Sequence, residues 1–153
     1  MPDSLQRFHQ RATQGWHQIA LRELRNGRKT SHWMWWVFPQ LDGLGTSRLA
    51  TEYALEDDDE ALSFLADPTL LANLVDVTEA VVKALDHGHS PETLMGGQTD
   101  VRKLVSSLTL FALVCDPEQP KQQHLRTLCE QALTGLDAHG FPQCRYTRDA
   151  LGY

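Results

Sequence analysis

The sequence has little of what marks several common protein classes. Its 153 residues include only three cysteines, Cys115, Cys129 and Cys144, and none of them has the CxxC spacing. This number and spacing indicate neither a disulfide framework nor a zinc knuckle. No apolar run approaches the roughly 20 residues that span a bilayer, and the first residues do not read as a signal peptide. We therefore expect a soluble protein of the cytoplasm, with no membrane partner.

Basic charge and the common catalytic motifs are also scarce. Fourteen Lys and Arg residues stand against twenty Asp and Glu residues, and the formal net charge is −6. This balance disfavours nucleic acid as a partner. The sequence contains no GxSxG, no HExxH and no P-loop glycine pattern. His87-Gly88-His89 offers two metal ligands without a third at a known spacing. We therefore expect no metal site and no cofactor.

What the sequence does have is a helical period. Apolar residues are 41% and charged residues 22% of the chain, which is typical of one globular domain. Apolar residues recur every three or four positions over 5–24, where Ser4 is placed as the N-cap, and over 68–85, 101–115 and 117–135. Shorter helices are expected after Ser31, Ser47 and Glu60. The cap-then-proline pairs Asp67-Pro68 and Ser90-Pro91 indicate two further helix starts, and Gly96-Gly97 closes the turn after the second.

No segment shows the alternation of a strand. The predicted fold is therefore an all-α, compact single-domain bundle of about six to seven helices, some of them short. We expect one domain over residues 1–153, with a core over 4–136 and an irregular C-terminal tail over 141–153.

The segment Lys29–Gln40 carries three of the four tryptophans. Ser31 as an N-cap and Pro39 as a terminator favour a short helix here. Neighbouring positions on a helix diverge by about 100°, so the three indole rings cannot all face the same way. One interpretation is a central helix that is buried on all sides. The other is a small-ligand pocket, because polar groups beside aromatic walls are typical of such pockets.

A second polar cluster lies on the predicted helix that begins near Asp100. Asp100 and Lys103 are three residues apart, and Lys103 and Ser107 are four apart, so they share one strip of the helix. An N-cap with an ordinary ion pair explains the cluster equally well. The alternative is a pocket between Lys29–Gln40 and the Asp100–Thr109 helix. Its predicted ligand-binding residues are Lys29, Ser31, Trp33, Trp36, Gln40, Asp100, Arg102, Lys103 and Ser107.

Such a pocket fits a small anionic or nucleotide-like ligand. Lys29, Arg102 and Lys103 would hold the anionic group, and Trp33 and Trp36 would stack on a ring. His32 is the candidate for acid–base catalysis, and the sequence leaves open whether any reaction is catalysed.

An alternative function uses the same segment. Exposed Trp and Phe side chains of Lys29–Gln40 would form a protein-interaction or homodimerisation surface, because aromatic anchors are common at such interfaces. The sequence does not determine the oligomeric state.

Several stretches resemble one known family. The most specific is Lys29–Gln40, and the others are Leu41–Gly45, Tyr53–Leu55, Glu60–Pro68 and Asp100–Phe111. They are similar to a bacterial domain-of-unknown-function family, numbered eighteen-ten, whose members are sometimes mislabelled calpastatin. The resemblance spans most of the chain. It implies a compact all-α fold and no established activity or cofactor.

Overall fold

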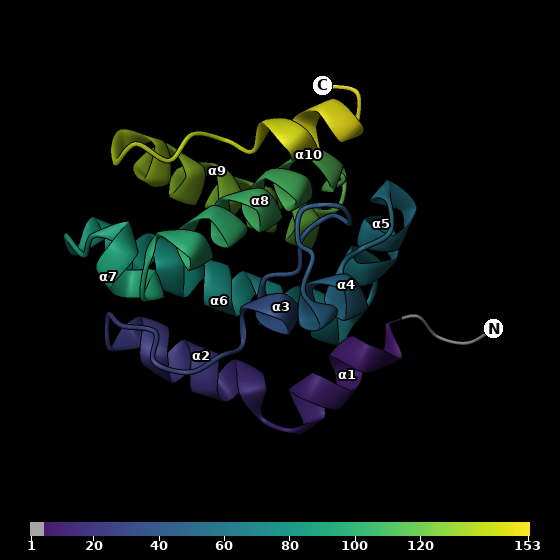
Figure 1. Ribbon diagram of the computed structural model, residues 1–153. Helices are drawn as coiled ribbons and strands as arrows, with labels where there is room; N and C mark the ends of the chain where they lie inside the picture. Colours follow the sequence, from purple (N-terminus) through teal and green to yellow (C-terminus); the bar gives the residue numbers. More distant parts are fainter. Residues whose placement is uncertain (1–4) are drawn as a thin grey trace.

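The computed structural model describes residues 5–153, and this part of the chain contains ten helices and no strand (Figure 1). The helices are α1 (Gln6–Thr13), α2 (Trp16–Arg25), α3 (Met34–Val37), α4 (Arg48–Tyr53), α5 (Asp58–Ala66), α6 (Pro68–Asp86), α7 (Pro91–Met95), α8 (Gln98–Val114), α9 (Pro120–Ala138) and α10 (Arg145–Ala150). Six of them have eight or more residues and four are short. The all-α prediction is confirmed.

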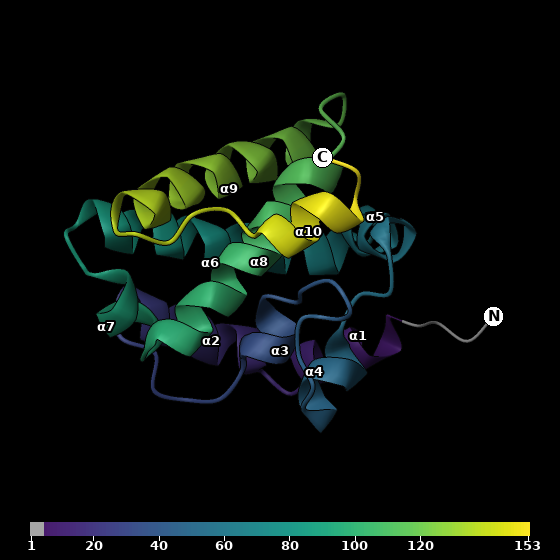
Figure 2. The same cartoon turned by 45° about the horizontal axis from the view of Figure 1, so that its top comes forward.

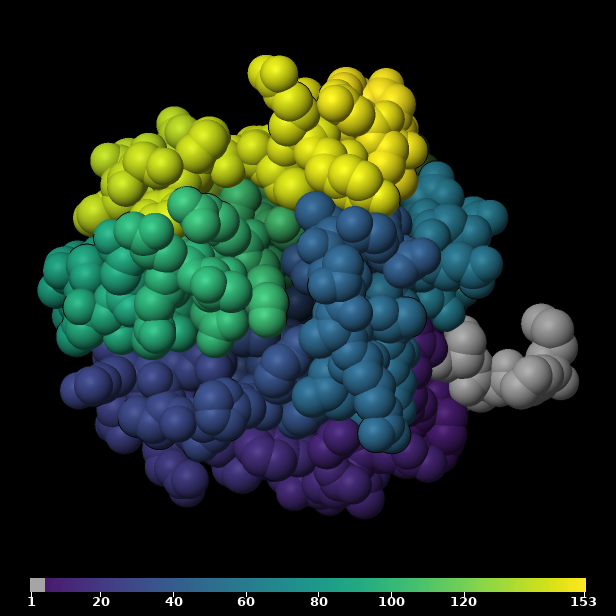
Figure 3. All heavy atoms as spheres, in the orientation of Figure 1, coloured from purple at the N-terminus to yellow at the C-terminus, as the bar shows by residue number. Residues whose placement is uncertain are grey.

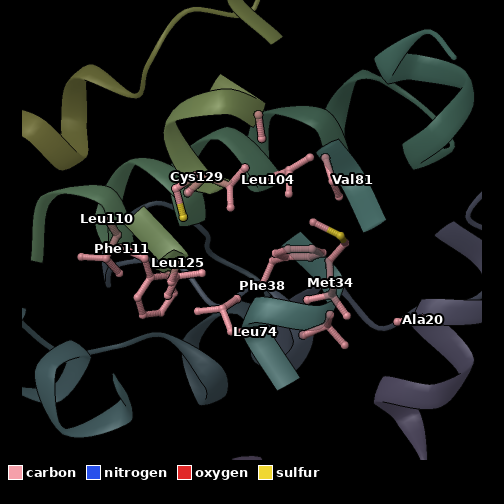
Figure 4. Close-up of a cluster of buried hydrophobic side chains, with 14 of the residues drawn as sticks. Ala20, Met34, Phe38, Leu74, Val81, Leu104, Leu110, Phe111, Leu125 and Cys129 are labelled. Carbon is pink, nitrogen blue, oxygen red and sulfur yellow. The ribbon is translucent and has the colours of Figure 1, made fainter. Parts of the chain in front are cut away.

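The three longest helices, α6, α8 and α9, form the centre of the molecule. Helix α9 packs against both α6 and α8, and α2 covers the other side of α6 (Figures 1 and 2). Their apolar faces meet in one continuous core, part of which is drawn in Figure 4, where side chains from α3, α6, α8 and α9 converge. None of the helices in residues 5–153 is both long and apolar enough to cross a membrane.

The N-terminal region forms two helices, whereas the sequence predicted one continuous helix over residues 5–24. Helix α1 ends at Thr13, and Gly15 adopts a φ of 87° before α2 begins at Trp16. This left-handed conformation costs little for glycine and stops a helix. The predicted continuous helix over 5–24 is therefore wrong at this point. The N-cap predicted at Ser4 lies outside the described residues.

Three of the other helices begin at the caps that their local sequence indicates, whereas α9 spans Pro120–Ala138 where the sequence predicted 117–135. The Ser47 hydroxyl accepts a hydrogen bond from the Ala50 amide at 3.1 Å and begins α4. The Asp67 carboxylate accepts from two amides in the first turn of α6, at 3.0 and 3.1 Å. Ser90 accepts from the Thr93 amide at 3.2 Å and begins α7. Each of these caps bonds to the backbone two or three residues ahead, so local sequence indicates it wherever no distant side chain competes for the cap.

The C-terminal tail contains a helix, so the expectation of an irregular tail over 141–153 is wrong for residues 145–150. Helix α10 packs on α8, and Thr147 is completely buried there. The Cys144 amide donates to the Thr109 hydroxyl at 3.2 Å, and the Tyr146 hydroxyl donates to the Asp42 carbonyl at 2.9 Å. In the space-filling view the C-terminal segment, in yellow, accordingly lies against the loop between α3 and α4, in blue (Figure 3). Six residues are too few to show a helical period, so tertiary contacts define this helix.

Candidate functional site

A buried carboxylate on α2 shapes the segment that follows this helix. Glu23 is 7% exposed and accepts hydrogen bonds from the amides of Thr30 and Ser31, at 2.7 and 2.9 Å. It also accepts from the Ser31 hydroxyl at 2.5 Å and from the Trp33 indole N–H at 3.0 Å. The loop from residue 30 to 33 is therefore wrapped around one side chain.

These donors keep Glu23 charged. Burial on its own raises the pKa of a carboxyl group, but the Ser31 hydroxyl, the two amides and the Trp33 indole outweigh it and lower the pKa of Glu23 to about 2. Ser31 and Trp33 were predicted to bind a ligand, and the structure assigns both to Glu23. Because Ser31 is engaged in this way it caps no helix, and α3 begins only at Met34.

A cavity of about 340 Å³ lies between this loop and the N-terminus of α8. Its lining residues are Lys29, His32, Met34, Trp35, Gly96, Gly97, Gln98, Thr99, Asp100 and Lys103. The structure thus brings together four of the residues predicted for the pocket, two from each of the segments named by the sequence. They are Lys29, His32, Asp100 and Lys103.

Two lysines approach the same carboxylate in this cavity. Lys29 is 8% exposed, and its ammonium group lies 2.9 Å from one Asp100 oxygen and donates to the Ser31 carbonyl at 2.6 Å. The Lys103 ammonium lies 3.8 Å from the other Asp100 oxygen and 5.0 Å from the centre of the Trp35 ring. Lys29 is consequently paired already, whereas Lys103 is held only loosely.

The first turn of α8 forms the other wall of the cavity. Its N-cap is Gly97, which has no side chain to accept hydrogen bonds from the amides that follow. Gly96 and Gly97 have φ values of 79° and 137°, a backbone path that other residues rarely take. The leading amides of a helix have no partner inside the helix and carry the positive end of its dipole. This wall therefore favours negative charge.

Four other predicted residues do not line the cavity. Trp36 is 4% exposed and packs between Trp16 and Tyr53. Gln40 lines a neighbouring void of only about 10 Å³, which shares Met34, Trp35 and Lys103 with the cavity. Arg102 is exposed on α8 and does not line the cavity, and Ser107 is completely buried. The helical repeat placed these side chains on the correct elements, but it did not determine the face that each element turns to the cavity.

Two parts of the cavity wall were not predicted from the sequence. Trp35 supplies the aromatic surface that the sequence assigned to Trp33 and Trp36. The adjacent Gly96 and Gly97 were interpreted only as the end of a turn. A glycine pair directly before a long helix is also a signal for an accessible helix N-terminus, and it could have identified this wall.

The aromatic side chains of residues 29–40 do not form an exposed surface. Trp33, Trp36 and Phe38 are at most 4% exposed. The large hydrophobic side chains that are exposed in the described residues are Leu62, Tyr146 and Tyr153, all outside this segment. The expectation of exposed Trp and Phe, on which the interaction hypothesis depended, is wrong for these three residues.

The fold and this cavity define an all-α domain with a polar cavity at the N-terminus of one of its long central helices. The chain belongs to the family described as "Protein of unknown function (DUF1810)", whose sequence model matches residues 2–135. The family resemblance noted in the sequence is thereby confirmed. A similar solved structure is the conserved hypothetical protein Rv1873 from Mycobacterium tuberculosis, with 34% identity and a TM-score of 0.80. The match covers 100% of this chain and 99% of that chain. Comparison with curated proteins gives no match.

Proposed function

We propose that this protein binds a small anionic or nucleotide-like ligand in the cavity between residues 29–35 and the N-terminus of α8. The observation that carries the proposal is the geometry of Lys103. Its ammonium group lies 5.0 Å from the centre of the Trp35 ring and only loosely contacts Asp100, at 3.8 Å. A cation beside an aromatic wall offers both an anion contact and a stacking surface.

The backbone supports the same choice of ligand. The uncapped first turn of α8 lines the cavity on the side that Lys103 also occupies. An anion there receives hydrogen bonds from the backbone in addition to a charge contact. The volume of about 340 Å³ lies near the lower end of the usual range for small-molecule sites, roughly 300–1,000 Å³, so it suits a ligand no larger than a mononucleotide.

His32 adds a possible chemical step to the proposed binding function. It is exposed and is the one imidazole among the described residues that line the cavity. The structure shows no hydrogen bond or ion pair to its side chain within residues 5–153. An unengaged imidazole beside a ligand site is suited to acid–base catalysis. The second part of the proposal is proton transfer by His32 to or from the bound ligand.

Thermal stability measured with and without ligand tests the binding function. The panel is mononucleotides, cyclic nucleotides, sugar phosphates and small ring carboxylates. A ligand at 100 times its Kd stabilises the folded state by about 2.7 kcal/mol, so a true ligand raises the Tm measurably. We expect this rise in the wild type and not in Lys103→Met.

Lys83→Met is the matched control for this measurement. Lys83 also pairs with an acidic residue on its own helix, Glu79 at 3.4 Å, and lines a different cavity of about 280 Å³. A Tm rise that is retained in Lys103→Met would show that binding occurs elsewhere. No rise with any compound would contradict the proposed function. For a ligand that binds, NMR follows whether the protein converts it to a product. Loss of this conversion in His32→Gln tests the proton-transfer step.

A further inference from the structure

The charges in the cavity nearly cancel, although two lysines line it. Lys29 and Lys103 contribute two positive charges and Asp100 removes one, which leaves a formal charge of +1 with His32 neutral. Lys29 contributes little to an incoming ligand, because its ammonium group is buried and already bound by Asp100 at 2.9 Å and by the Ser31 carbonyl at 2.6 Å. Among the lining residues, Lys103 is therefore the lysine whose charge is available to an anionic ligand.

We infer that the site selects a ligand with one planar ring and one negative charge, and that Asp100 sets this limit; the inference rests on the proposed function. The ligand class is a cyclic nucleotide, in which the base is the planar ring and the phosphodiester carries the charge, or an aromatic carboxylate. A ligand of this class neutralises Lys103 and the positive end of α8 and leaves no excess charge. The ring lies against Trp35, the aromatic side chain that lines the cavity.

More highly charged ligands meet the Asp100 carboxylate. This side chain is 24% exposed, lies in the first turn of α8 and lines the cavity. A phosphomonoester or a diphosphate brings a second or third negative charge toward it, with no further free cation among the lining residues. Like charges placed close together in a partly buried site repel each other and act against the wrong ligand. Asp100 is therefore a specificity-determining residue as well as the partner of Lys29.

A charge series on one nucleoside tests the inference. Isothermal titration with adenosine, cyclic 3′,5′-AMP, AMP and ADP varies the charge while the ring stays the same, and nicotinate with nicotinamide repeats the comparison for a carboxylate. In the wild type we expect the singly charged member of each series to bind most tightly, about tenfold better than AMP or the neutral compound. Asp100→Asn retains an oxygen acceptor for Lys29. In this variant we expect the affinity for AMP to rise about tenfold and to exceed the affinity for cyclic AMP.

Two further variants isolate the role of the charge. Asp86→Asn makes the same charge change at an exposed position at the end of α6, outside this cavity, and we expect it to leave the preference unchanged. Lys103→Gln removes the loosely paired cation that would contact the ligand, and we expect the affinity for cyclic AMP to fall to that for adenosine. Circular dichroism of each variant shows that it is folded.

The possible results separate this inference from the proposed function. Binding that strengthens with each added phosphate in the wild type, or an unchanged preference in Asp100→Asn, would overturn the inference while the proposed function stands. The same shift in Asp86→Asn would overturn it too, because a general charge effect would then explain the data. If neither series binds, both the proposed function and the inference are contradicted.

Discussion

At the scale of the residue, Glu23 determines the shape of the loop beside the cavity. Its carboxylate accepts four hydrogen bonds from three residues, Thr30, Ser31 and Trp33. Hydrogen bonds to a charged acceptor are stronger than neutral ones, and a buried donor without an acceptor costs free energy.

We therefore expect Glu23→Gln to lower the free energy of unfolding by about 2–4 kcal/mol, measured by urea denaturation. Glu130→Gln is the control, because Glu130 is mostly exposed and pairs only with Arg126 on its own helix. Its loss should be within about 0.5 kcal/mol. Equal losses for the two variants would contradict the role given to Glu23.

His17 gives the protein a second residue-scale property, a dependence of stability on pH. It is 4% exposed on α2, its Nδ1 atom has no partner, and burial lowers its pKa to about 4. The unfolded chain therefore takes up a proton near pH 6.5, whereas the folded protein does so only near pH 4. Stability from this group is complete above pH 6.5 and falls as the pH drops toward 4.

We expect the free energy of unfolding to fall by about 3 kcal/mol as the pH drops from about 6.5 to about 4, because each unit of pKa shift corresponds to about 1.4 kcal/mol. Urea midpoints at pH 7, 6, 5 and 4 measure it, and His17→Gln should flatten the curve over this range. The low pKa of Glu23 adds its own loss mainly below about pH 5, so the difference between the wild type and His17→Gln above that pH reports His17. A wild type and a variant with parallel curves there would show that His17 does not titrate as described.

At the scale of the element, one hydroxyl connects α8 to α10. The buried Thr109 hydroxyl donates to the Val105 carbonyl at 2.7 Å and accepts from the Cys144 amide at 3.2 Å. Its second bond spans 35 residues, and α10 has only six residues of its own. A helix this short depends on its tertiary contacts.

We expect Thr109→Val to cost about 1–2 kcal/mol and to speed amide hydrogen exchange over residues 144–151. Thr78→Val is the matched control, since the Thr78 hydroxyl is equally buried and bonds only within α6, to the Leu74 carbonyl at 2.7 Å. Exchange in α10 should not change in that variant. Equal exchange in both would mean that other contacts hold α10 in place.

The sequence was most informative where the controlling contact was local. The caps at Ser47, Asp67 and Ser90 were predictable because each bonds to an amide two or three residues away. Ser31 has the same chemistry, but Glu23, eight residues earlier, takes its hydroxyl. For the same reason the sequence identified the two segments that form the cavity and could not show that Trp35, rather than Trp33, faces it.

At the scale of the whole molecule, the four tryptophans and the C-terminal half of the core lie far apart in sequence. The tryptophans occupy positions 16–36, whereas α9 ends at Ala138, yet one continuous core joins these regions. Small domains with one core usually unfold in a single step. Tryptophan fluorescence should therefore report damage that is made in α9.

Leu136→Ala removes a completely buried side chain at the end of α9 and should cost about 2–5 kcal/mol. We expect the unfolding midpoints from tryptophan fluorescence and from far-UV circular dichroism to move together. Two separated midpoints would show that the N-terminal and C-terminal parts unfold independently.

The Glu23 cluster also divides the region around the cavity into positions to keep and positions to change when the protein is engineered. Glu23, Ser31 and Trp33 share one hydrogen-bonded group, so substitutions among them will not be additive and acceptable combinations will be rare. His32, Trp35 and Lys103 line the cavity outside this group. A library that varies these three side chains and keeps the Glu23 cluster intact can therefore change the chemistry of the cavity wall while the loop backbone stays in place.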